Sequence, residues 1–315
     1  MKVKFLNKFL LISVLIVVQN ATAQSDTTLI KSHLEQLTKT KGYRHFMNVE
    51  LLNKTADFIA SEFKKHADTT YFQEYQVNGI TYKNVVCLFK PTLINSFGPS
   101  NSELVVIGAH YDACGMQEGA DDNASGVVGL LEIARQLNEK QFSHPIELVA
   151  YTLEEPPYFR TENMGSYVHA KSLADSKKTV YGMVSLEMIG YFKDEKKSQD
   201  YPIGLMRLFY GSKGNYITLV NKFGKGKFSR KFTTIFKHTK HIRSKKFNGP
   251  KVLPGVDFSD HLNYWRFNFS ALMLTDTAFY RNKNYHQDTD TMETLDLGRM
   301  AKVIDSTLET LCNLK

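Results

Sequence analysis

The amino-acid sequence predicts an α/β fold, a three-layer α/β/α sandwich built around a largely parallel central mixed sheet. Two observations lead to this prediction. Short stretches of strand length recur along the chain and are apolar on both faces, which is typical of strands covered by helices on both sides. Segments with apolar residues at helical spacing lie between these stretches.

The first elements predicted are two helices and a hairpin. Apolar residues recur at helical spacing between residues 28 and 65, and Gly42 divides this segment into two helices. Strands are predicted at 71–77 and 80–88. The Asn78-Gly79 pair between them is a common two-residue hairpin turn.

Four further strands are predicted at 104–109, 146–152, 180–186 and 271–274. Helical patterns separate them, most clearly at 125–138. One face of that helix carries Val127, Leu130, Leu131, Ala134 and Leu137. In sheets of this kind ligands bind at the carboxyl ends of the strands, so polar residues at those ends are the candidates for a functional site.

The N-terminus predicts a secretory signal peptide over residues 1–23. Lys2, Lys4 and Lys8 precede an apolar core at 9–18, and Ala21-Thr22-Ala23 follows. That core is too short to cross a bilayer, and no later stretch is long and apolar enough to do so. We therefore expect an exported protein, periplasmic or secreted, whose residues 24–315 form a single domain.

Charge gives little support for a nucleic-acid partner. Removal of the three lysines of the signal peptide lowers the formal net charge from +8 to +5. Residues 211–251 hold many Lys and Arg and no Asp or Glu, but no nucleic-acid motif accompanies them. We interpret this basic stretch as a solvated helix face and loop.

Cys87, Cys114 and Cys312 are too few for a disulfide framework, and their odd number leaves at least one thiol free. A disulfide bond between Cys87 and Cys114 is one possibility that the sequence leaves open.

The stretch "GAHYDACGMQEGADDNASG" at 108–126 crowds acidic residues after a predicted strand. His110 and Asp112 leave this strand at a spacing of two, so their side chains can point to the same side. Asp121 and Asp122 lead into a helix. A helix N-cap explains one acidic residue there, but not two adjacent ones flanked by small residues. A divalent cation would hold these carboxylates together.

The next two strands also end in acidic residues. Glu154 and Glu155 precede two prolines, and such a pair allows one carboxylate to bind a metal while its neighbour acts as a general base. Glu187 interrupts an otherwise apolar run, "SLEMIG".

Two histidines near the C-terminus are further candidates. His286 is followed closely by Asp288 and Asp290. His261, directly after Asp260, has two open interpretations: a polar residue lining the site near a metal, or a hydrogen-bonded structural histidine. Candidates to line a substrate pocket, by proximity to His286, are Tyr280, Arg281 and Tyr285.

From about residue 30 to 310 the chain resembles the zinc exopeptidase superfamily of secreted bacterial leucyl aminopeptidases, glutaminyl cyclases and glutamate carboxypeptidase. The matching motifs, in the family's order, are "AHYD", "GADDNASG", "EE", "SLEMIG" and the His before "DT". The resemblance implies two zinc ions bridged by Asp122. The other ligands it implies are His110 and Glu187 for one ion, and Glu155 and His286 for the other.

The resemblance further implies that Glu154 is the general base and that Asp112 orients His110. The family often has Asp where this chain has Glu187, whose longer side chain also binds zinc. A cis peptide bond after the bridging residue, between Asp122 and Asn123, is implied as well. Zinc suits such mixed His and carboxylate ligands.

The resulting expectation is a secreted zinc aminopeptidase that removes N-terminal residues from peptides. The metals would activate a water molecule, and Glu154 would take its proton and return it to the leaving amine. Three alternatives stay open. They are a glutaminyl cyclase with one zinc, a carboxypeptidase or other amidase on the same metal site, and a binding protein that has lost the chemistry. The last is disfavoured because none of the five expected ligands is missing.

Overall fold

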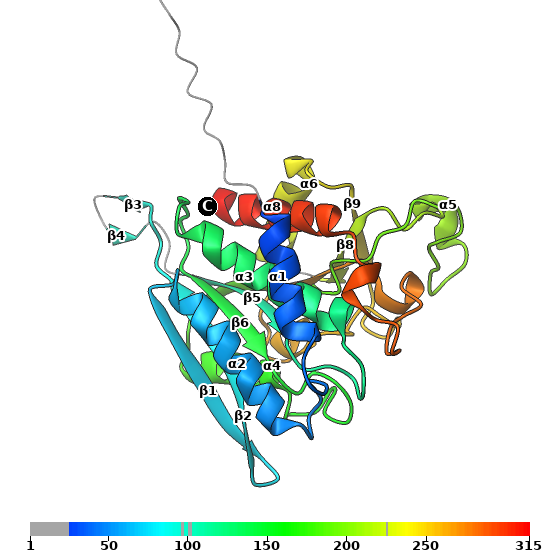
Figure 1. Ribbon diagram of the computed structural model, residues 1–315. Coiled ribbons are helices and arrows are strands. Elements are labelled where there is room, and N and C mark those ends of the chain that lie inside the picture. Colours follow the sequence, from blue (N-terminus) through cyan, green and yellow to red (C-terminus); the bar gives the residue numbers. More distant parts are fainter. Residues whose placement is uncertain (1–24, 96–97, 100–102, 225) are drawn as a thin grey trace, which may run out of the picture.

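The computed structural model describes residues 25–95, 98–99, 103–224 and 226–315 (Figure 1). The predicted signal peptide, residues 1–23, lies outside the described residues. The α-helices are α1 (Thr27–Thr38), α2 (Val49–Lys64), α3 (Gly126–Leu137), α4 (Gly165–Asp175), α5 (Met206–Tyr210), α6 (Lys227–Thr239), α7 (His261–Arg266) and α8 (Leu297–Asn313). A π-helix, η1 (Ala120–Ser125), precedes α3, and two 3₁₀ turns follow later, η2 (Ala278–Tyr280) and η3 (Met292–Thr294).

The strands form an eight-stranded sheet in the order β1-β2-β6-β5-β7-β10-β8-β9, with a separate β3-β4 pair. Their bounds are β1 (Thr69–Val77), β2 (Ile80–Phe89), β3 (Ile94–Asn95), β4 (Gly98–Pro99), β5 (Leu104–His110), β6 (Ile146–Tyr151), β7 (Val180–Glu187), β8 (Ile217–Lys222), β9 (Ser244–Gly249) and β10 (Ala271–Thr275). The central neighbours β6, β5, β7 and β10 are parallel, whereas β1, β2 and β8 join by antiparallel pairings. The sequence-based fold class is confirmed.

Alternate residues of the central strands enter two separate apolar cores. On β5, Val105 and Ile107 belong to one core, and Leu104 and Val106 belong to the other. The first core lies under α1, α2, α3, α6 and α8, and the second lies under α4 and α7. Strands buried on both faces thus account for the continuous apolar runs in the sequence.

Local sequence signals explain where several elements begin and turn. The Asp26 carboxylate accepts a hydrogen bond of 2.8 Å from the Thr28 N–H and caps α1. The β1–β2 hairpin turns at Asn78 and Gly79, which both have positive φ, 51° and 80°. A two-residue turn of this kind requires that backbone conformation, which Asn and Gly adopt at low cost.

The interpretation of residues 211–251 as a helix face and loop was incomplete. This stretch contains α6, whose Phe228, Phe232 and Phe236 are buried, and also β8 and β9. The strand β9 lies at the end of the sheet and carries Lys245 and Lys246. Lysines are common on edge strands because they discourage pairing with other chains. Here the two adjacent lysines interrupt the pattern of apolar residues by which a strand is recognised in a sequence.

All three cysteines are free in the structure, so the bridge left open between Cys87 and Cys114 does not form. Cys87 is buried in β2, whereas Cys114 lies partly exposed in the loop after β5.

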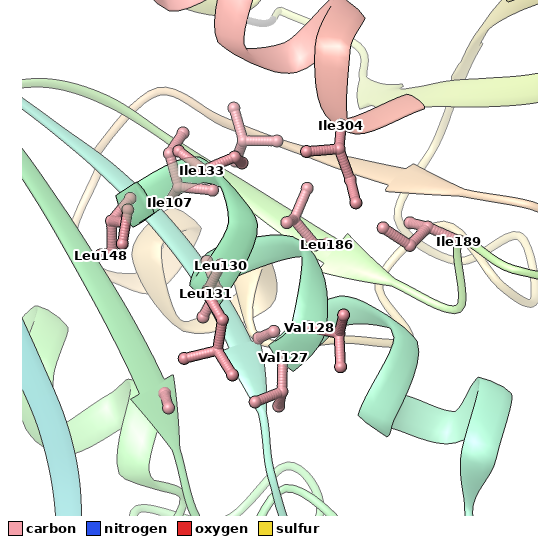
Figure 2. Packing of buried hydrophobic residues seen from close by; sticks show 14 of the residues in the cluster. Ile107, Val127, Val128, Leu130, Leu131, Ile133, Leu148, Leu186, Ile189 and Ile304 are labelled. Carbon is pink, nitrogen blue, oxygen red and sulfur yellow. The ribbon is translucent and has the colours of Figure 1, made fainter. Parts of the chain in front are cut away.

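The helix α3 anchors the larger core, and Figure 2 shows Leu130 packed among Ile107, Leu148 and neighbouring residues. Leu130 is fully buried. We expect Leu130→Ala to lower the free energy of unfolding by about 2–5 kcal/mol, because it removes buried methyl groups and leaves a cavity. Leu208→Ala, on the exposed face of α5, should change it by less than about 0.5 kcal/mol. Urea unfolding followed by circular dichroism measures both, and equal midpoints for the two variants would contradict this packing.

Candidate metal centre

The ends of three adjacent parallel strands bring the predicted site residues together. His110 is the last residue of β5 and Glu187 is the last residue of β7. Glu154 and Glu155 follow shortly after β6 ends at Tyr151. Because β6, β5 and β7 are neighbours running in the same direction, these side chains meet at one edge of the sheet.

The carboxylate of Asp122 lies between two histidines. Its Oδ1 is 3.4 Å from His110 Nε2, and its Oδ2 is 3.2 Å from His286 Nε2. Asp122 itself is almost fully buried. One carboxylate therefore faces a separate imidazole with each of its two oxygens.

Each histidine has a second carboxylate beside it. Glu187 Oε2 is 3.5 Å from His110 Nε2, and Glu155 Oε2 is 3.2 Å from His286 Nε2. The remaining carboxylate, Glu154, places Oε2 at 3.8 Å from His110 Nε2. The structure thus arranges the predicted residues as two triads that share Asp122, with Glu154 close to both.

These atoms fit a metal centre. His110, Asp122 and Glu187 each offer a ligand atom, and the three atoms lie within 4.8 Å of one another. The buried atoms His110 Nε2, His286 Nε2 and Glu155 Oε1 have no hydrogen-bond partner. Buried polar atoms are normally paired, so these unpaired atoms, which belong to two neighbouring clusters, are candidates to bind metal ions. Imidazole nitrogens and carboxylate oxygens are ligands suited to zinc.

The charges at the site also favour a cation. Burial raises the pKa of Glu154 well above its usual value. Burial and the neighbouring Asp122 carboxylate raise the pKa of Glu155 to about 8. Burial would raise the pKa of Asp122 too, but the rings of His110 and His286 lower it below its usual range. The buried carboxylates outnumber the positively charged groups beside them, so a bound dication would stabilise their ionised forms.

Asp112 supports the backbone of the Glu154-Glu155 pair. Its Oδ1 accepts a hydrogen bond of 3.2 Å from the Glu154 N–H, and its Oδ2 accepts one of 3.1 Å from the Glu155 N–H. The Nδ1 of His110 lies 3.2 Å from the Asp112 carbonyl oxygen and 3.6 Å from its carboxylate. The predicted role of Asp112 in orienting His110 stays a prediction, and the two backbone contacts are a further role that the sequence did not indicate.

Asp290 supports Asp122 in a similar way. The N–H groups of Asp121 and Asp122 donate to the two carboxylate oxygens of Asp290 at 3.0 and 3.1 Å. Asp290 is fully buried, and burial raises its pKa to about 8. The peptide bond between Asp122 and Asn123 is cis, as the resemblance implied.

Ser259 and Asp260 complete the surroundings of the first triad. The Ser259 hydroxyl donates a 2.7 Å hydrogen bond to Glu187 Oε2. Asp260 is fully buried with both carboxylate oxygens unpaired, and burial raises its pKa to about 7. The stretch "FSDHLNYW" had offered Asp260 as a candidate together with His261, but nothing in the sequence indicated Ser259, whose contact depends on a loop that folds back over the end of β7.

The two interpretations of His261 are separated by its contacts. Its Nε2 makes a 2.8 Å hydrogen bond to the Val256 carbonyl oxygen, and its ring packs edge-on against Trp265. Burial lowers its pKa to about 4. These contacts support the structural interpretation of His261.

The three candidates for pocket lining differ in outcome. Tyr280 lines the large pocket beside Glu187, and Tyr285 stacks on the ring of His286 with centroids 3.8 Å apart. Arg281 is buried instead, where it donates to Gln199 Oε1 at 2.9 Å.

Comparison with known proteins decides the family. The sequence pattern described as peptidase family M28 matches residues 92–311. This chain belongs to peptidase family M28. The family lies within the zinc exopeptidase superfamily, which includes aminopeptidases and glutaminyl cyclases, so the resemblance noted in the sequence is confirmed.

Among M28 relatives, the chain is 39% identical over 294 residues to the Escherichia coli (strain K12) protein YfbL, covering 91% of this chain and 88% of YfbL. Its fold is similar to that of the Legionella pneumophila LapA aminopeptidase, with a TM-score of 0.67, 20% identity, and coverage of 92% of this chain and 73% of LapA. It is also similar to that of Tannerella forsythia glutaminyl cyclase, with a TM-score of 0.65, 22% identity, and coverage of 93% and 100%.

For the M28 centre described above, we expect Asp290→Asn to weaken zinc binding by about 10- to 100-fold, as is usual when a group that orients a ligand is lost. The amide NH₂ of Asn would face a backbone N–H donor at Asp121 or Asp122. The control is Asp288→Asn, an exposed residue of the same loop. Competition with a chromogenic chelator measures the affinity, and equal affinities for the two variants would show that Asp290 does not position Asp122.

Proposed function

We propose that this M28 peptidase is a zinc-dependent aminopeptidase that removes N-terminal residues from peptides. The observation that carries the proposal is that the metal centre and a pocket are adjacent, because Glu187 belongs to both. The triads support two metal positions bridged by Asp122. The largely apolar pocket supports recognition of the side chain of an N-terminal residue.

The pocket has largely apolar walls. Val220, Phe247 and Met273 form part of its lining. Full burial of a side chain such as Leu or Phe contributes about 1.5–3 kcal/mol, so these walls favour bulky apolar residues.

The side chains that line the pocket bear on which end of a peptide enters it. Among the described residues that form this lining there is no Lys, Arg or His. Of its two carboxylates, Glu187 is a proposed metal ligand, and Asp200 is paired with Arg207 at 3.2 Å and with Lys283 at 2.9 Å. None of these lining residues therefore offers a cation to a C-terminal carboxylate, which supports aminopeptidase activity over carboxypeptidase activity.

In the proposed centre His110 and Glu187 would hold one zinc ion, Glu155 and His286 would hold the other, and Asp122 would serve both. When bound, zinc supplies Lewis-acid chemistry that polarises the scissile carbonyl and makes water a stronger nucleophile at neutral pH.

Glu154 is the proposed general base. Its buried carboxylate lies beside His110 and is not needed to complete either triad. It takes a proton from the attacking water on a carboxylate oxygen and delivers that proton to the leaving amine. The enclosed site excludes bulk water from this transfer, since Glu154 is only 7% exposed.

Export is part of the proposal and is supported by the signal-peptide pattern at residues 1–23. None of the described helices is long and apolar enough to cross a membrane. Peptides outside the cytoplasm are the substrates that this location implies.

The proposal is tested by mass spectrometry of products from a peptide panel. The N-terminal residue is Leu, Phe, Gly, Asp or Gln, and each peptide carries a free or an acetylated N-terminus. We expect stepwise N-terminal release from free amines only, with Leu and Phe favoured over Gly by about 10- to 100-fold. A chelator should stop the reaction, and zinc should restore it.

Other products would overturn the proposal in distinct ways. Loss of ammonia from the Gln peptides alone would identify a glutaminyl cyclase. Release of C-terminal residues would identify a carboxypeptidase. Cleavage that persists in the chelator would argue against the metal centre.

For the general base, we expect Glu154→Gln to lower kcat by about 10²- to 10⁴-fold while zinc content stays unchanged, because the amide accepts no proton. Glu162→Gln, an exposed residue in the segment between β6 and α4, is the matched control and should retain full activity. Steady-state kinetics and elemental analysis provide the two readouts. Undiminished turnover in the Glu154 variant would exclude this residue as the base.

A further inference from the structure

Cys114 lies beside the second triad and has no role in the proposed function. Its Sγ, a carboxylate oxygen of Glu155 and a ring nitrogen of His286 all lie within 4.8 Å of one another. The thiol is free and partly buried. Cys114 therefore belongs to the same cluster of ligand atoms as two residues that we assign to the second metal ion.

An independent observation points to a ligand at this place. Glu155 is only 5% exposed, and its Oε1 has no hydrogen-bond partner. The Nε2 of His286 is also unpaired, although Asp122 and Glu155 approach it. A thiol, a carboxylate and an imidazole thus lie together, and two of these groups carry a buried atom without a hydrogen-bond partner.

The loop that carries Cys114 is held in place by Arg44. The Ala113 N–H donates to the Arg44 carbonyl oxygen at 3.0 Å. The buried Arg44 guanidinium donates to the carbonyl oxygens of Tyr111, at 2.9 Å, and Gly119, at 3.0 Å. These bonds fix the loop on both sides of Cys114. The hydrogen bonds of Arg44 therefore hold the Cys114 thiol in a defined position.

We propose that the Cys114 thiolate is a fourth protein ligand of the second metal ion, beside Asp122, Glu155 and His286. This inference rests on the proposed two-metal centre. Binding forms a sulfur–metal bond and releases the thiol proton to solvent.

The proposal makes the two metal positions chemically different. The first has one nitrogen and carboxylate oxygens, whereas the second adds a soft sulfur donor. Thiolate ligands favour zinc over hard ions such as Mn²⁺ and Mg²⁺. The second position is then the more selective one for zinc, and oxidation or alkylation of Cys114 would weaken it.

The experiment replaces zinc by Co²⁺ in the purified protein and records the absorption spectrum together with the cobalt content. We expect two ions per chain and a near-ultraviolet band from thiolate-to-cobalt charge transfer. Cys114→Ser should lose this band and retain the visible bands of cobalt at the first position. Cys312→Ser, a control cysteine distant in sequence from the site, should keep the full spectrum.

A second measurement does not depend on a variant. Zinc should protect Cys114 of the unaltered protein from iodoacetamide, and mass spectrometry of the digested protein should show no protection of Cys312. In Cys114→Ser the second zinc should dissociate at least about tenfold more readily, since even loss of a group that only orients a ligand weakens binding by about 10- to 100-fold.

The outcomes separate the two proposals. Two bound cobalt ions without the sulfur band, and equal alkylation of Cys114 with and without zinc, would overturn the role of Cys114 alone. Fewer than two bound ions would overturn the two-metal centre, and the Cys114 proposal with it.

Discussion

The burial of several carboxylates at one edge of the sheet is the constraint on which the rest of the site depends. An unpaired buried charge is very costly, so every such group needs donors or a cation nearby. Asp112 and Asp290 obtain backbone N–H groups, and Asp122 obtains two imidazoles. Glu155 retains an oxygen with no partner. Asp112 and Asp290 are thus compensated within the protein, whereas Glu155 and the neighbouring Asp260 keep unpaired oxygens close to where the two triads meet.

The supporting groups act on backbone rather than on side chains, which explains how the geometry is fixed. Asp112 holds the turn after β6, Asp290 holds the N–H groups at the start of η1, and Arg44 holds the loop between β5 and η1 through carbonyl oxygens. Three connections of the sheet are tied to one another in this way. A site assembled from strand ends would otherwise be only as precise as the loops that follow them.

Sequence patterns were sufficient for the parts of the molecule that depend on side-chain character along one element. Strands buried on both faces are apolar throughout, so β5, β6, β7 and β10 were found, and the ordered motifs located the residues of both triads. The strands β8 and β9 were both missed. The edge position of β9 allows Lys245 and Lys246, and β8, although buried, lies in the same lysine-rich stretch that was interpreted as a helix face and loop. The contacts of Asp290 and Ser259 were missed for another reason. They depend on where a backbone N–H points or how a loop returns, and neither leaves a periodic signal in the sequence.

The triads and the pocket come from different parts of the fold, which explains how members of one family can keep a metal centre and differ in substrate. The triads come from the ends of strands whose position the sheet fixes, whereas the pocket draws Tyr201 and Tyr210 from the segment between β7 and β8, and Phe258 and Tyr280 from segments on either side of β10. These segments contribute few contacts to the main cores, so their sequences can change without loss of the fold. The motifs therefore predict chemistry at the sheet edge, while the choice of peptide end and side chain depends on the walls. In this chain the walls combine aromatic and aliphatic residues with Glu187, which belongs to the first triad, and Asp200, which is paired with Arg207 and Lys283.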